Sequence, residues 1–527
     1  MSRKYIFVTG GVLSGVGKGI TAASVGAILQ AKGLNVTVQK CDPYLNIDAG
    51  LLDPAEHGEC FVTKDGAETD LDLGHYERFL DVELTRDAST LSGRLLMELI
   101  QDERNGKYGG KTVQYVPHLT DKIQEAIIKS GGDSDVHIVE IGGTVGDYEG
   151  LSFIEAIREF SRRVGADNCL YVHVVYVPYI SSSGEFKTKP AQNALRDLRG
   201  FGVVPDCVVV RTDRDAPQSV ADKIALFGGV APENVILQPN VDSVYAVPLR
   251  IASSDVHKLL DTFTGVDTVP NMSRWHDLVK SQMSQKDKSV NIGVVAKYLD
   301  NDDTYISIVQ ALESAGWKNG VKVDISWLDA NTVEPDDLSD VDGILVPGGF
   351  GEAGIEGKVM AARFALDESR PYLGVSLGLQ AAAIAAARRA GDASASTVEL
   401  DKGLVDSVIH KAVYGDEVSL GRDGMRLGEY QTDLSQGSLA SRLYGGVVVS
   451  ERHRHRYEVN PAFVDTLERG GVMVAGRSAQ GQLIDFIEGV DHPFFLATQA
   501  HPEYKSRPYR AHPLFDGFIR AAAGIDN

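Results

Sequence analysis

The sequence contains only four cysteines, and no two of them form a CxxC pair. They are Cys41, Cys60, Cys169 and Cys207, so the chain contains no cysteine after position 207. This pattern argues against a disulfide framework and suits a reducing, cytoplasmic compartment.

Long hydrophobic runs and an excess of basic residues are also missing. No stretch reaches 18 consecutive apolar residues, so no transmembrane helix is expected. The N-terminal segment MSRKYIFVTGG reaches glycine too soon for a signal peptide. Lys and Arg total 52 against 73 Asp and Glu, a net charge of −21. Such an acidic chain is a poor general binder of nucleic acid or anionic membranes, although local basic pockets can still bind small anions.

The length of 527 residues allows two to four domains at roughly 150 residues each. Apolar runs at 4–9 and 34–40 flank a glycine-rich turn and an alanine-rich helical segment, an order that predicts a parallel α/β sheet. Runs at 137–141, 170–178 and 207–211 extend this sheet, and we expect one α/β domain over 1–265.

Residues 266–290 lack a strong apolar period and are predicted to be a linker with a short helix. A second α/β domain is predicted over 291–527, because apolar runs resume there. Its expected strands lie at 291–298, 321–328, 343–347, 372–376 and 494–499.

The first motif with clear chemistry is the segment from Gly10 to Gly19, between an expected strand and an expected helix. Backbone N–H groups and a helix N-terminus can hold phosphate at such a place, and Lys18 can reach terminal phosphates from a solvent-facing loop. The strict Walker pattern is not met, because the spacing is one residue longer and Gly19 follows the lysine. The alternative is a plain glycine-rich turn.

Two acidic segments suit a metal near this loop. One is AETDLDLGHYERF (67–79), and the other is VEIGGTVGD (139–147), where Glu140 ends an apolar strand. Ligands collect at the carboxyl ends of strands in open α/β sheets, and Mg²⁺ takes one or two carboxylates together with phosphate oxygens. Solvated surface charge is the alternative for either segment alone.

A further segment, which is basic, is GEFKTKPAQ (184–192). In it two lysines flank a threonine in a loop bounded by glycine and proline. This loop could clamp a second polyphosphate, although a solvated loop is the default interpretation of so short a motif.

In the second half, Gly374 to Gly378 spells G-x-S-x-G between a strand and a helix, the pattern of a nucleophile elbow at Ser376. In an extended chain His501 and Glu503 would share a face, so Glu503 could orient His501 as the base. The segment PGGFG (347–351) ends another strand and could form an oxyanion hole. The run ERHRHRY (451–457) could be a solvated basic strand, or it could hold a carboxylate through Arg456.

Together these segments closely resemble the CTP synthase family over nearly the whole chain. The longest matching strings are DGAETDLDLGHYERF and SERHRHRYEVN, and shorter ones include YIFVTGG, DPYLN, VEIGGTVGD, VPGGFG and HPLF. The resemblance implies an N-terminal, P-loop-like amidoligase domain and a C-terminal class I glutamine amidotransferase domain. It implies an enzyme that phosphorylates O4 of UTP with ATP, after which ammonia released from glutamine displaces the phosphate and gives CTP.

The resemblance also implies residue roles. Ser376, His501, Glu503 and Lys18 would be catalytic, and Asp72 and Glu140 would hold Mg²⁺. ATP would contact Gly15, Val16, Gly17, Lys18, Gly19, Ile20, Lys40 and Asp72. UTP or CTP would contact Ser14, Asp147, Tyr148, Glu149, Lys187, Thr188, Lys189, Pro190, Ala191, Gln192 and Lys223. Glutamine would contact Gly349, Gly351, Leu377, Gly378, Leu379, Gln380, Glu399 and Arg456. Activation by GTP, feedback inhibition by CTP and a homotetramer, with filaments as a further form, are also implied.

The departures from the family pattern fall mostly in the glutaminase half. The family nucleophile is cysteine, but here Ser376 stands in its place. The family arginine in GFGxRG is Ala353, AxSTEF is altered at 395–400, and Tyr148 replaces an isoleucine. A single exchange in an intact triad resembles a deliberate trap, whereas the neighbouring departures indicate natural decay, and both alternatives stay open.

We therefore expect a CTP synthase whose glutaminase step is impaired. One alternative is a serine hydrolase of the G-x-S-x-G type, which the chain order Ser376, His501, Glu503 disfavours, since such hydrolases place the acid before the histidine. The other is a non-catalytic nucleotide-binding filament protein, against which the intact Lys18, Asp72 and Glu140 weigh.

Overall fold

The computed structural model describes residues 2–284, 286–400, 403–404, 406–411, 414, 420–421 and 424–525. The chain divides into two compact units that do not follow chain order. Unit 1 comprises 1–49 and 72–283, and unit 2 comprises 50–71 and 284–527. The segment 50–71, which the sequence placed in the N-terminal domain, thus packs with the C-terminal half.

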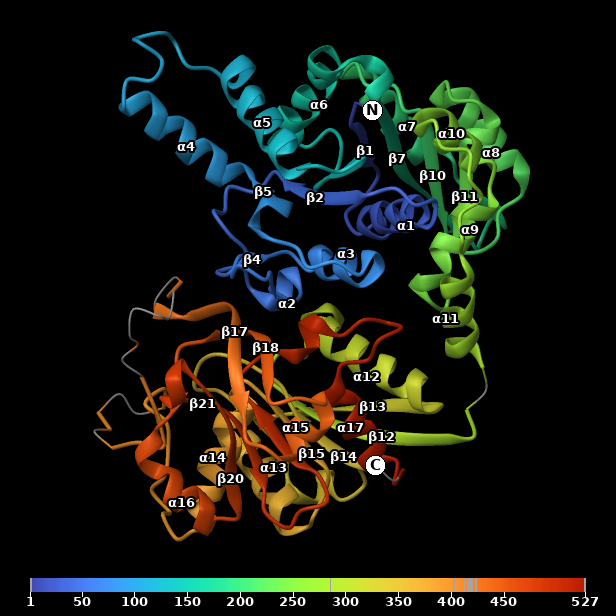
Figure 1. The fold of residues 1–527 in the computed structure, drawn as a ribbon. Coiled ribbons are helices and arrows are strands. Elements are labelled where there is room, and N and C mark those ends of the chain that lie inside the picture. The colour runs from blue at the N-terminus through green and yellow to red at the C-terminus, as the bar shows by residue number, and fades with distance from the viewer. Residues whose placement is uncertain are drawn as a thin grey trace. The chain divides into compact units, whose positions relative to one another are not determined.

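Unit 1 is built on a parallel seven-stranded sheet in the order β11-β10-β7-β1-β6-β2-β5 (Figure 1). Its strands are β1 (Lys4–Gly10), β2 (Val36–Asp42), β5 (Ser89–Leu91), β6 (Val136–Ile141), β7 (Cys169–Val177), β10 (Cys207–Thr212) and β11 (Val235–Pro239). The predicted parallel α/β sheet is confirmed, and its central strands β1 and β6 are buried along nearly their whole length, as expected of a sheet that helices cover on both faces.

The helices of unit 1 flank this sheet. Figure 1 shows α1 and α3 on one face of the sheet and α5 and α6 on the other. One core cluster joins β1, β2 and β6 to α4, α5 and α6 through Phe7, Ile123 and Phe160, among others. The helix bounds are α1 (Lys18–Ala31), α3 (Asp72–Leu80), α4 (Ser92–Arg104), α5 (Thr120–Ser130), α6 (Leu151–Val164), α7 (Lys189–Gly200), α8 (Gln218–Gly228), α9 (Val247–Ser253), α10 (Val256–Thr264) and α11 (Ser273–Met283).

The predicted linker over 266–290 holds more structure than its composition suggests. Its short helix is α11, and Trp275 on that helix is buried against Phe79, with ring centroids 5.2 Å apart. The first strand of unit 2 begins at Lys288, inside the predicted linker. Trp275 and Leu278 are the buried residues that hold α11 within unit 1, and two apolar residues are too few for an analysis of periodicity to detect.

Unit 2 contains a nine-stranded mixed sheet in the order β13-β12-β14-β15-β22-β21-β20-β17-β18. The strands from β13 to β22 are parallel, and those from β21 to β18 are antiparallel. Their bounds are β12 (Lys288–Ala296), β13 (Val321–Asp329), β14 (Gly343–Val346), β15 (Tyr372–Val375), β17 (Arg426–Leu434), β18 (Val448–His455), β20 (Val472–Ser478), β21 (Leu483–Gly489) and β22 (Phe495–Thr498). The antiparallel half was not expected from the sequence, apart from the alternative of a strand at 451–457.

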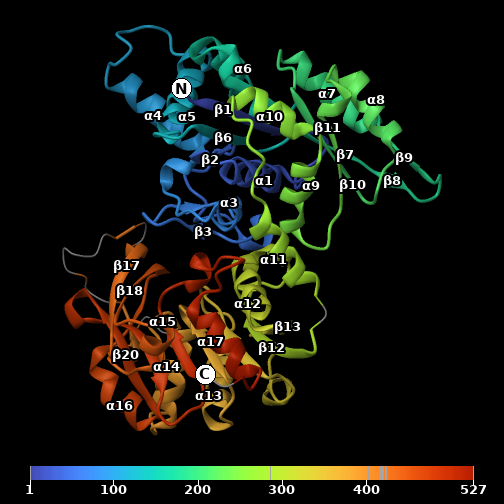
Figure 2. The same cartoon turned by 45° about the vertical axis from the view of Figure 1, so that its right-hand side comes forward.

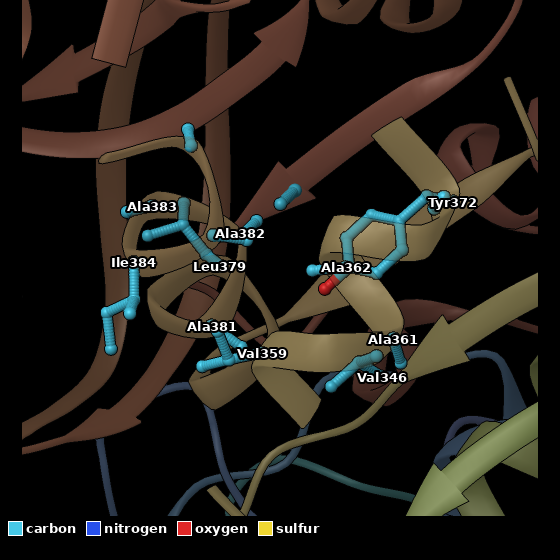
Figure 3. Close-up of a cluster of buried hydrophobic side chains, with 14 of the residues drawn as sticks. Val346, Val359, Ala361, Ala362, Tyr372, Leu379, Ala381, Ala382, Ala383 and Ile384 are labelled. Carbon is cyan, nitrogen blue, oxygen red and sulfur yellow. The ribbon is translucent and has the colours of Figure 1, made fainter. Parts of the chain in front are cut away.

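Two buried clusters cover the faces of the second sheet. On one face α13 (Ile355–Asp367), α14 (Leu377–Arg389) and α16 (Val464–Arg469) enclose Val346, Tyr372 and Leu379. Figure 3 shows how small side chains such as Ala361 and Ala382 let the helices approach closely around the Tyr372 ring. On the other face lie α12 (Ile306–Asn319), α15 (Leu439–Tyr444) and α17 (Pro513–Ala522).

The segment 50–71 is tied into unit 2 by side chains of β18 and α12. It carries α2 (Pro54–His57) and a small hairpin of β3 (Phe61–Val62) and β4 (Glu68–Thr69). Arg454 donates to the Glu68 carboxylate at 2.9 Å, and Arg452 donates to the carbonyl of Val62 at 3.0 Å. The run ERHRHRY is therefore a mostly buried strand, and the interpretation as a solvated basic strand is wrong.

All four cysteines are described, and none is disulfide-bonded. Among the described residues, no helix has the length and apolarity needed to cross a bilayer.

Candidate functional site

The glycine-rich loop of unit 1 leads from β1 directly into α1, as the sequence predicted. Gly17 caps α1 with a φ of 94°, a left-handed conformation that glycine adopts at no steric cost. Ser14 and Gly15 are exposed, whereas Lys18 is only 7% exposed. The Lys18 ammonium donates to the carbonyl of Gly143 at 2.9 Å, and burial lowers its pKa, although Glu140 opposes the shift. The tip of the loop thus faces solvent, as expected, whereas the Lys18 side chain at its end is buried.

The residues predicted to hold Mg²⁺ come together beside this loop. Lys40 on β2 and Glu140 on β6 are register partners, with the Lys40 ammonium 3.1 Å from the Glu140 carboxylate. Lys40 also contacts Asp72 at the start of α3, and Tyr76 donates to Glu140. Burial raises the pKa of Glu140, while Lys40 opposes this shift.

The surroundings of Gly19 leave no room for the serine or threonine side chain that follows the lysine in a Walker motif. A β-carbon there would lie 2.1 Å from Oδ1 of Asp72 and 3.4 Å from Oε2 of Glu140. Carboxylates from α3 and β6 thus fill the space in which a Walker serine or threonine side chain would stand.

Asp42 belongs to the same group, although the sequence analysis did not single it out. It is buried, and its carboxylate lies 3.7 Å from Lys40. The signal was available, because Asp42 opens the DPYLN string at the carboxyl end of β2. Carboxylate oxygens from Asp72 and Glu140 are the donor type that Mg²⁺ prefers. Among the described residues there is no cluster of three or more His, Cys, Asp or Glu that could hold a metal by protein ligands alone.

The segment 184–192 is not a continuous loop. Residues 179–186 form the β8–β9 hairpin (Tyr179–Ile180 and Glu185–Phe186), which projects from unit 1 in Figure 2. Lys189 to Gln192 form the first turn of α7. The expected single loop is therefore a hairpin end followed by a helix N-terminus. Lys187 is exposed and contacts Glu185, and the charge of Lys223 also lowers the pKa of that carboxyl.

The predicted contact residues for UTP or CTP do not share one cavity. Tyr148 and Glu149 line a cavity of about 610 Å³ together with Pro43, Tyr115 and Phe201, whereas the basic residues Lys187, Lys189 and Lys223 do not line it. Tyr148 is 91% exposed, and Asp147 accepts from the backbone N–H of Thr144 at 3.3 Å.

In unit 2, Ser376 lies on a sharp turn between β15 and α14, the predicted elbow. Its φ of 52° and ψ of −104° are unusual for a residue with a side chain, and such strain is characteristic of functional turns. Ser376 is buried, and its backbone N–H donates to the carbonyl of Thr498 on β22 at 2.8 Å.

The glycines of the elbow allow close packing of backbones. A β-carbon on Gly378 would lie 2.1 Å from the carbonyl oxygen of Val346. Because that atom belongs to a buried strand, Gly378→Ala should lower the free energy of unfolding of unit 2 by about 1–3 kcal/mol. Gly446→Ala is the matched control, since its β-carbon would meet nothing within 4 Å. Urea unfolding measures both, and an equal stability of the two variants would contradict this account.

His501 and Glu503 form the predicted pair, with Nδ1 of His501 2.7 Å from Oε1 of Glu503. The chain between them is not extended, because Pro502–Lys505 form a 3-10 turn, so the pairing is confirmed but its predicted geometry is wrong. Tyr504 stacks on the His501 ring with centroids 5.2 Å apart. Nε2 of His501 is buried and has no hydrogen-bond partner among the described residues.

Gly348 joins the nucleophile turn to this pair. A β-carbon on Gly348 would lie 2.8 Å from Cε1 of His501 and 3.6 Å from the β-carbon of Ser376. The loop Pro347–Phe350 and the His501–Glu503 pair line a cavity of about 250 Å³, with Arg456 on its wall. The segment 50–60 of unit 2 also lines it, through Leu51 and Cys60 among others.

Of the predicted glutamine residues, Gly349 and Arg456 line this cavity, whereas Gly351, Leu377 to Gln380 and Glu399 do not. Oε1 of Glu399 accepts from the N–H of Gly351 at 2.7 Å, which brings two of them together. The Arg456 guanidinium lies over the Phe350 ring at 5.3 Å. Gln380 is buried and donates to the carbonyl of Tyr457 at 3.2 Å. Leu377, Gly378 and Leu379 form the buried first turn of α14.

Comparisons with known proteins match both halves of the chain to known families. Residues 4–264 match the family model for the CTP synthase N-terminus, and 301–521 match that for class I glutamine amidotransferase. CTP synthase of Methanococcus maripaludis is 46% identical over 530 residues, covering 98% of this chain and 99% of that protein. The chain belongs to the CTP synthase family. CTP synthases of Thermus thermophilus and Corynebacterium jeikeium are 47% and 46% identical, each match covering 99% of this chain and 97% of the relative.

As a member of this family, the chain is an enzyme of the ligase class with a glutamine amidotransferase domain. Sequence reasoning missed three residues around the cavity. They are Lys297 and Lys358, which donate to carbonyls of the 347–351 loop, and Tyr504. In the sequence, Lys358 ends the segment EGK (356–358) and Tyr504 follows the segment HPE (501–503).

Proposed function

We propose that this chain aminates UTP to CTP with ATP through a 4-phosphorylated UTP, and that nitrogen enters as glutamine or ammonia with an impaired glutaminase step. The family relationship over at least 98% of the chain is the observation that carries the proposal. The convergence of Lys18, Lys40, Asp72 and Glu140 beside a phosphate-type loop supports it.

In unit 1, the loop from Ser14 to Ile20 binds nucleotide phosphates through backbone N–H groups at the start of α1. Lys18 and Lys40 supply positive charge to the transferring phosphoryl group. Asp72 and Glu140 would hold Mg²⁺, which neutralises charge on the phosphates when bound. Lys18 exchanges its contact with the Gly143 carbonyl for a phosphate oxygen, and this exchange favours the ammonium form that burial alone disfavours.

In unit 2, the cavity beside Ser376 takes glutamine, with Arg456 and Glu399 as charged partners and Gly349, Gly351 and Leu377 to Gln380 as further contacts. Nε2 of His501 is the atom that would accept the proton of Oγ, and Glu503 orients the ring through Nδ1. A serine hydroxyl is far harder to deprotonate than a cysteine thiol, so this step is slow.

The remaining proposals rest on the family relationship. They are activation by GTP, feedback inhibition by CTP at Asp147, Tyr148 and Glu149, and a homotetramer that can assemble into filaments. A cytoplasmic location stays a prediction from the cysteine pattern.

One assay tests the proposal against its alternatives. CTP formation from UTP and ATP is measured with ammonium chloride or glutamine as the nitrogen source. We expect CTP with ammonium and almost none with glutamine. Hydrolysis of simple esters without CTP formation would favour a serine hydrolase, and nucleotide binding without turnover would favour the filament protein.

The three basic residues Lys187, Lys189 and Lys223 are expected to bind UTP. Each of Lys187→Ala, Lys189→Ala and Lys223→Ala should raise the KM for UTP about tenfold or more, because a hydrogen bond to a charged group contributes about 1.5–3 kcal/mol. The KM for ATP should change less. Lys258→Ala is the control, since this exposed lysine on α10 pairs with Asp255. Steady-state kinetics with ammonium decide the matter, and equal effects on both nucleotides would speak against a dedicated UTP site.

A further inference from the structure

The loop Pro347–Gly351 has its carbonyl groups held by two lysines from outside the nucleophile turn. Lys358 on α13 donates to the carbonyl of Pro347 at 2.7 Å and contacts that of Gly348 at 3.4 Å. Lys297, at the end of β12, donates to the carbonyls of Phe350 and Gly351 at 2.8 and 2.6 Å. A second donor to Phe350 is the Tyr298 hydroxyl, at 3.1 Å.

Lys358 is unusual among these residues because it is completely buried. Its exposed fraction is 0%, and no described carboxylate lies within salt-bridge distance of its ammonium group. Burial lowers its pKa well below the ordinary value, and the charge of Lys297 adds to this shift. An ammonium group buried without a carboxylate lowers the stability of the fold. An apolar side chain of similar length would fill the same space at a smaller cost in free energy.

The position of Lys358 determines which way the loop peptides point. Pro347, Gly348 and Gly349 line the cavity with His501, whereas Lys358 does not. The carbonyls that Lys358 holds therefore point away from the cavity. In a trans peptide the C=O and the following N–H point in opposite directions, so the N–H groups of Gly348 and Gly349 point towards the cavity.

The first of these two glycines, Gly348, lies beside the nucleophile. Gly348 is in contact range of both the His501 ring and the β-carbon of Ser376. Stabilisation of a tetrahedral oxyanion requires preorganised donors of this kind next to the attacking atom.

We propose that Lys358 is a positioning residue, whose buried ammonium holds the 347–349 peptides so that their N–H groups face the oxyanion formed at residue 376. Lys358 touches neither substrate nor nucleophile and acts through the backbone of Pro347 and Gly348. This inference rests on the proposed glutamine site of unit 2.

The test uses two ligands, each with a full-length protein that does not turn it over. Glutamine is bound to the protein with Ser376 in place, in which hydrolysis is nearly absent, and its analogue with an aldehyde in place of the carboxamide is bound to the Ser376→Cys protein. The thiol sulfur bonds to the aldehyde carbon, the C=O bond becomes a C–O⁻ single bond, and the thiol proton passes to Nε2 of His501, so the oxygen occupies the oxyanion position. Calorimetry measures both affinities with and without Lys358→Met.

If Lys358 positions the loop, Lys358→Met weakens aldehyde binding about 10²-fold, as loss of an oxyanion donor does, while glutamine binding changes less than threefold. Val359→Ala is the matched control, because it opens a cavity on the same helix without touching the loop carbonyls. It should leave the ratio of the two affinities unchanged. Equal weakening of both ligands by Lys358→Met, or no weakening of either, would overturn the proposal.

Two further measurements keep the result interpretable. Lys358→Gln retains an N–H donor on a shorter side chain, and should lower the aldehyde affinity by an intermediate factor even if Lys358→Met does not fold. An unchanged ratio in Lys358→Gln would also count against the role. Ammonia-dependent CTP formation should be unaffected by Val359→Ala. Its absence already in the protein without substitutions would refute the proposed function instead, so the two failures are distinguishable.

Discussion

Ser376→Cys should raise glutamine-dependent CTP formation by on the order of 10⁴-fold, while ammonia-dependent formation stays within about twofold. A cysteine thiol has a reference pKa of about 8.5, and a neighbouring histidine readily converts it to the thiolate. The structure supplies the remaining parts, because the elbow turn at Ser376, the His501–Glu503 pair and the loop at Gly348 are all in place. Steady-state rates with each nitrogen source measure the effect.

Two departures from the family pattern bear on this expectation. Ala353 is exposed on the loop after Gly351, and Glu399 reaches the N–H of Gly351 despite the altered segment around it. The glutamine site is therefore expected to work once the thiol is restored. Ser376→Ala is the control and should leave ammonia use intact. Strong glutamine use by the unaltered protein that disappears in Ser376→Ala would instead make Ser376 a true nucleophile.

Lys18→Ala should lower ammonia-dependent CTP formation by about 10³-fold or more, because phosphoryl transfer relies on fixed positive charge at the transferring group. The substitution removes one hydrogen bond, to the carbonyl of Gly143, so we expect a loss of only about 1 kcal/mol in stability. Initial rates with saturating ammonium measure the first effect, and thermal unfolding measures the second.

Lys129→Ala is the matched control for Lys18, since it removes an exposed lysine of unit 1 that pairs with Asp87. It should leave CTP formation unchanged. Near-normal turnover in Lys18→Ala would show that the glycine-rich loop does not hold the transferring phosphate.

Sequence patterns located most of the elements that carry the two sites. The strand before the phosphate loop, the strand before Ser376 and the helices after both appear near their predicted positions, because a buried parallel strand is a continuous apolar run. Edge and antiparallel strands such as β17 and β20 mix polar and apolar residues, and they were not predicted. The burial of Arg452 and His453 on β18 could not be predicted from the sequence, because they belong to a run of mostly charged residues.

The sequence by itself determined the features that depend on neighbours along the chain. The turn at Gly17, the elbow at Ser376 and the pairing of His501 with Glu503 each involve only a few consecutive residues. Local backbone geometry and side-chain reach are enough to specify such features.

Only the tertiary structure decided which distant segments complete each site. The packing of residues 50–71 into unit 2, the contact of Lys40 with Asp72 and Glu140, and the burial of Lys358 behind the 347–349 loop all join residues far apart in sequence or in different elements. Such contacts follow from how helices and sheets pack, and a lysine in a helix carries no local mark that its ammonium will be buried against a loop carbonyl.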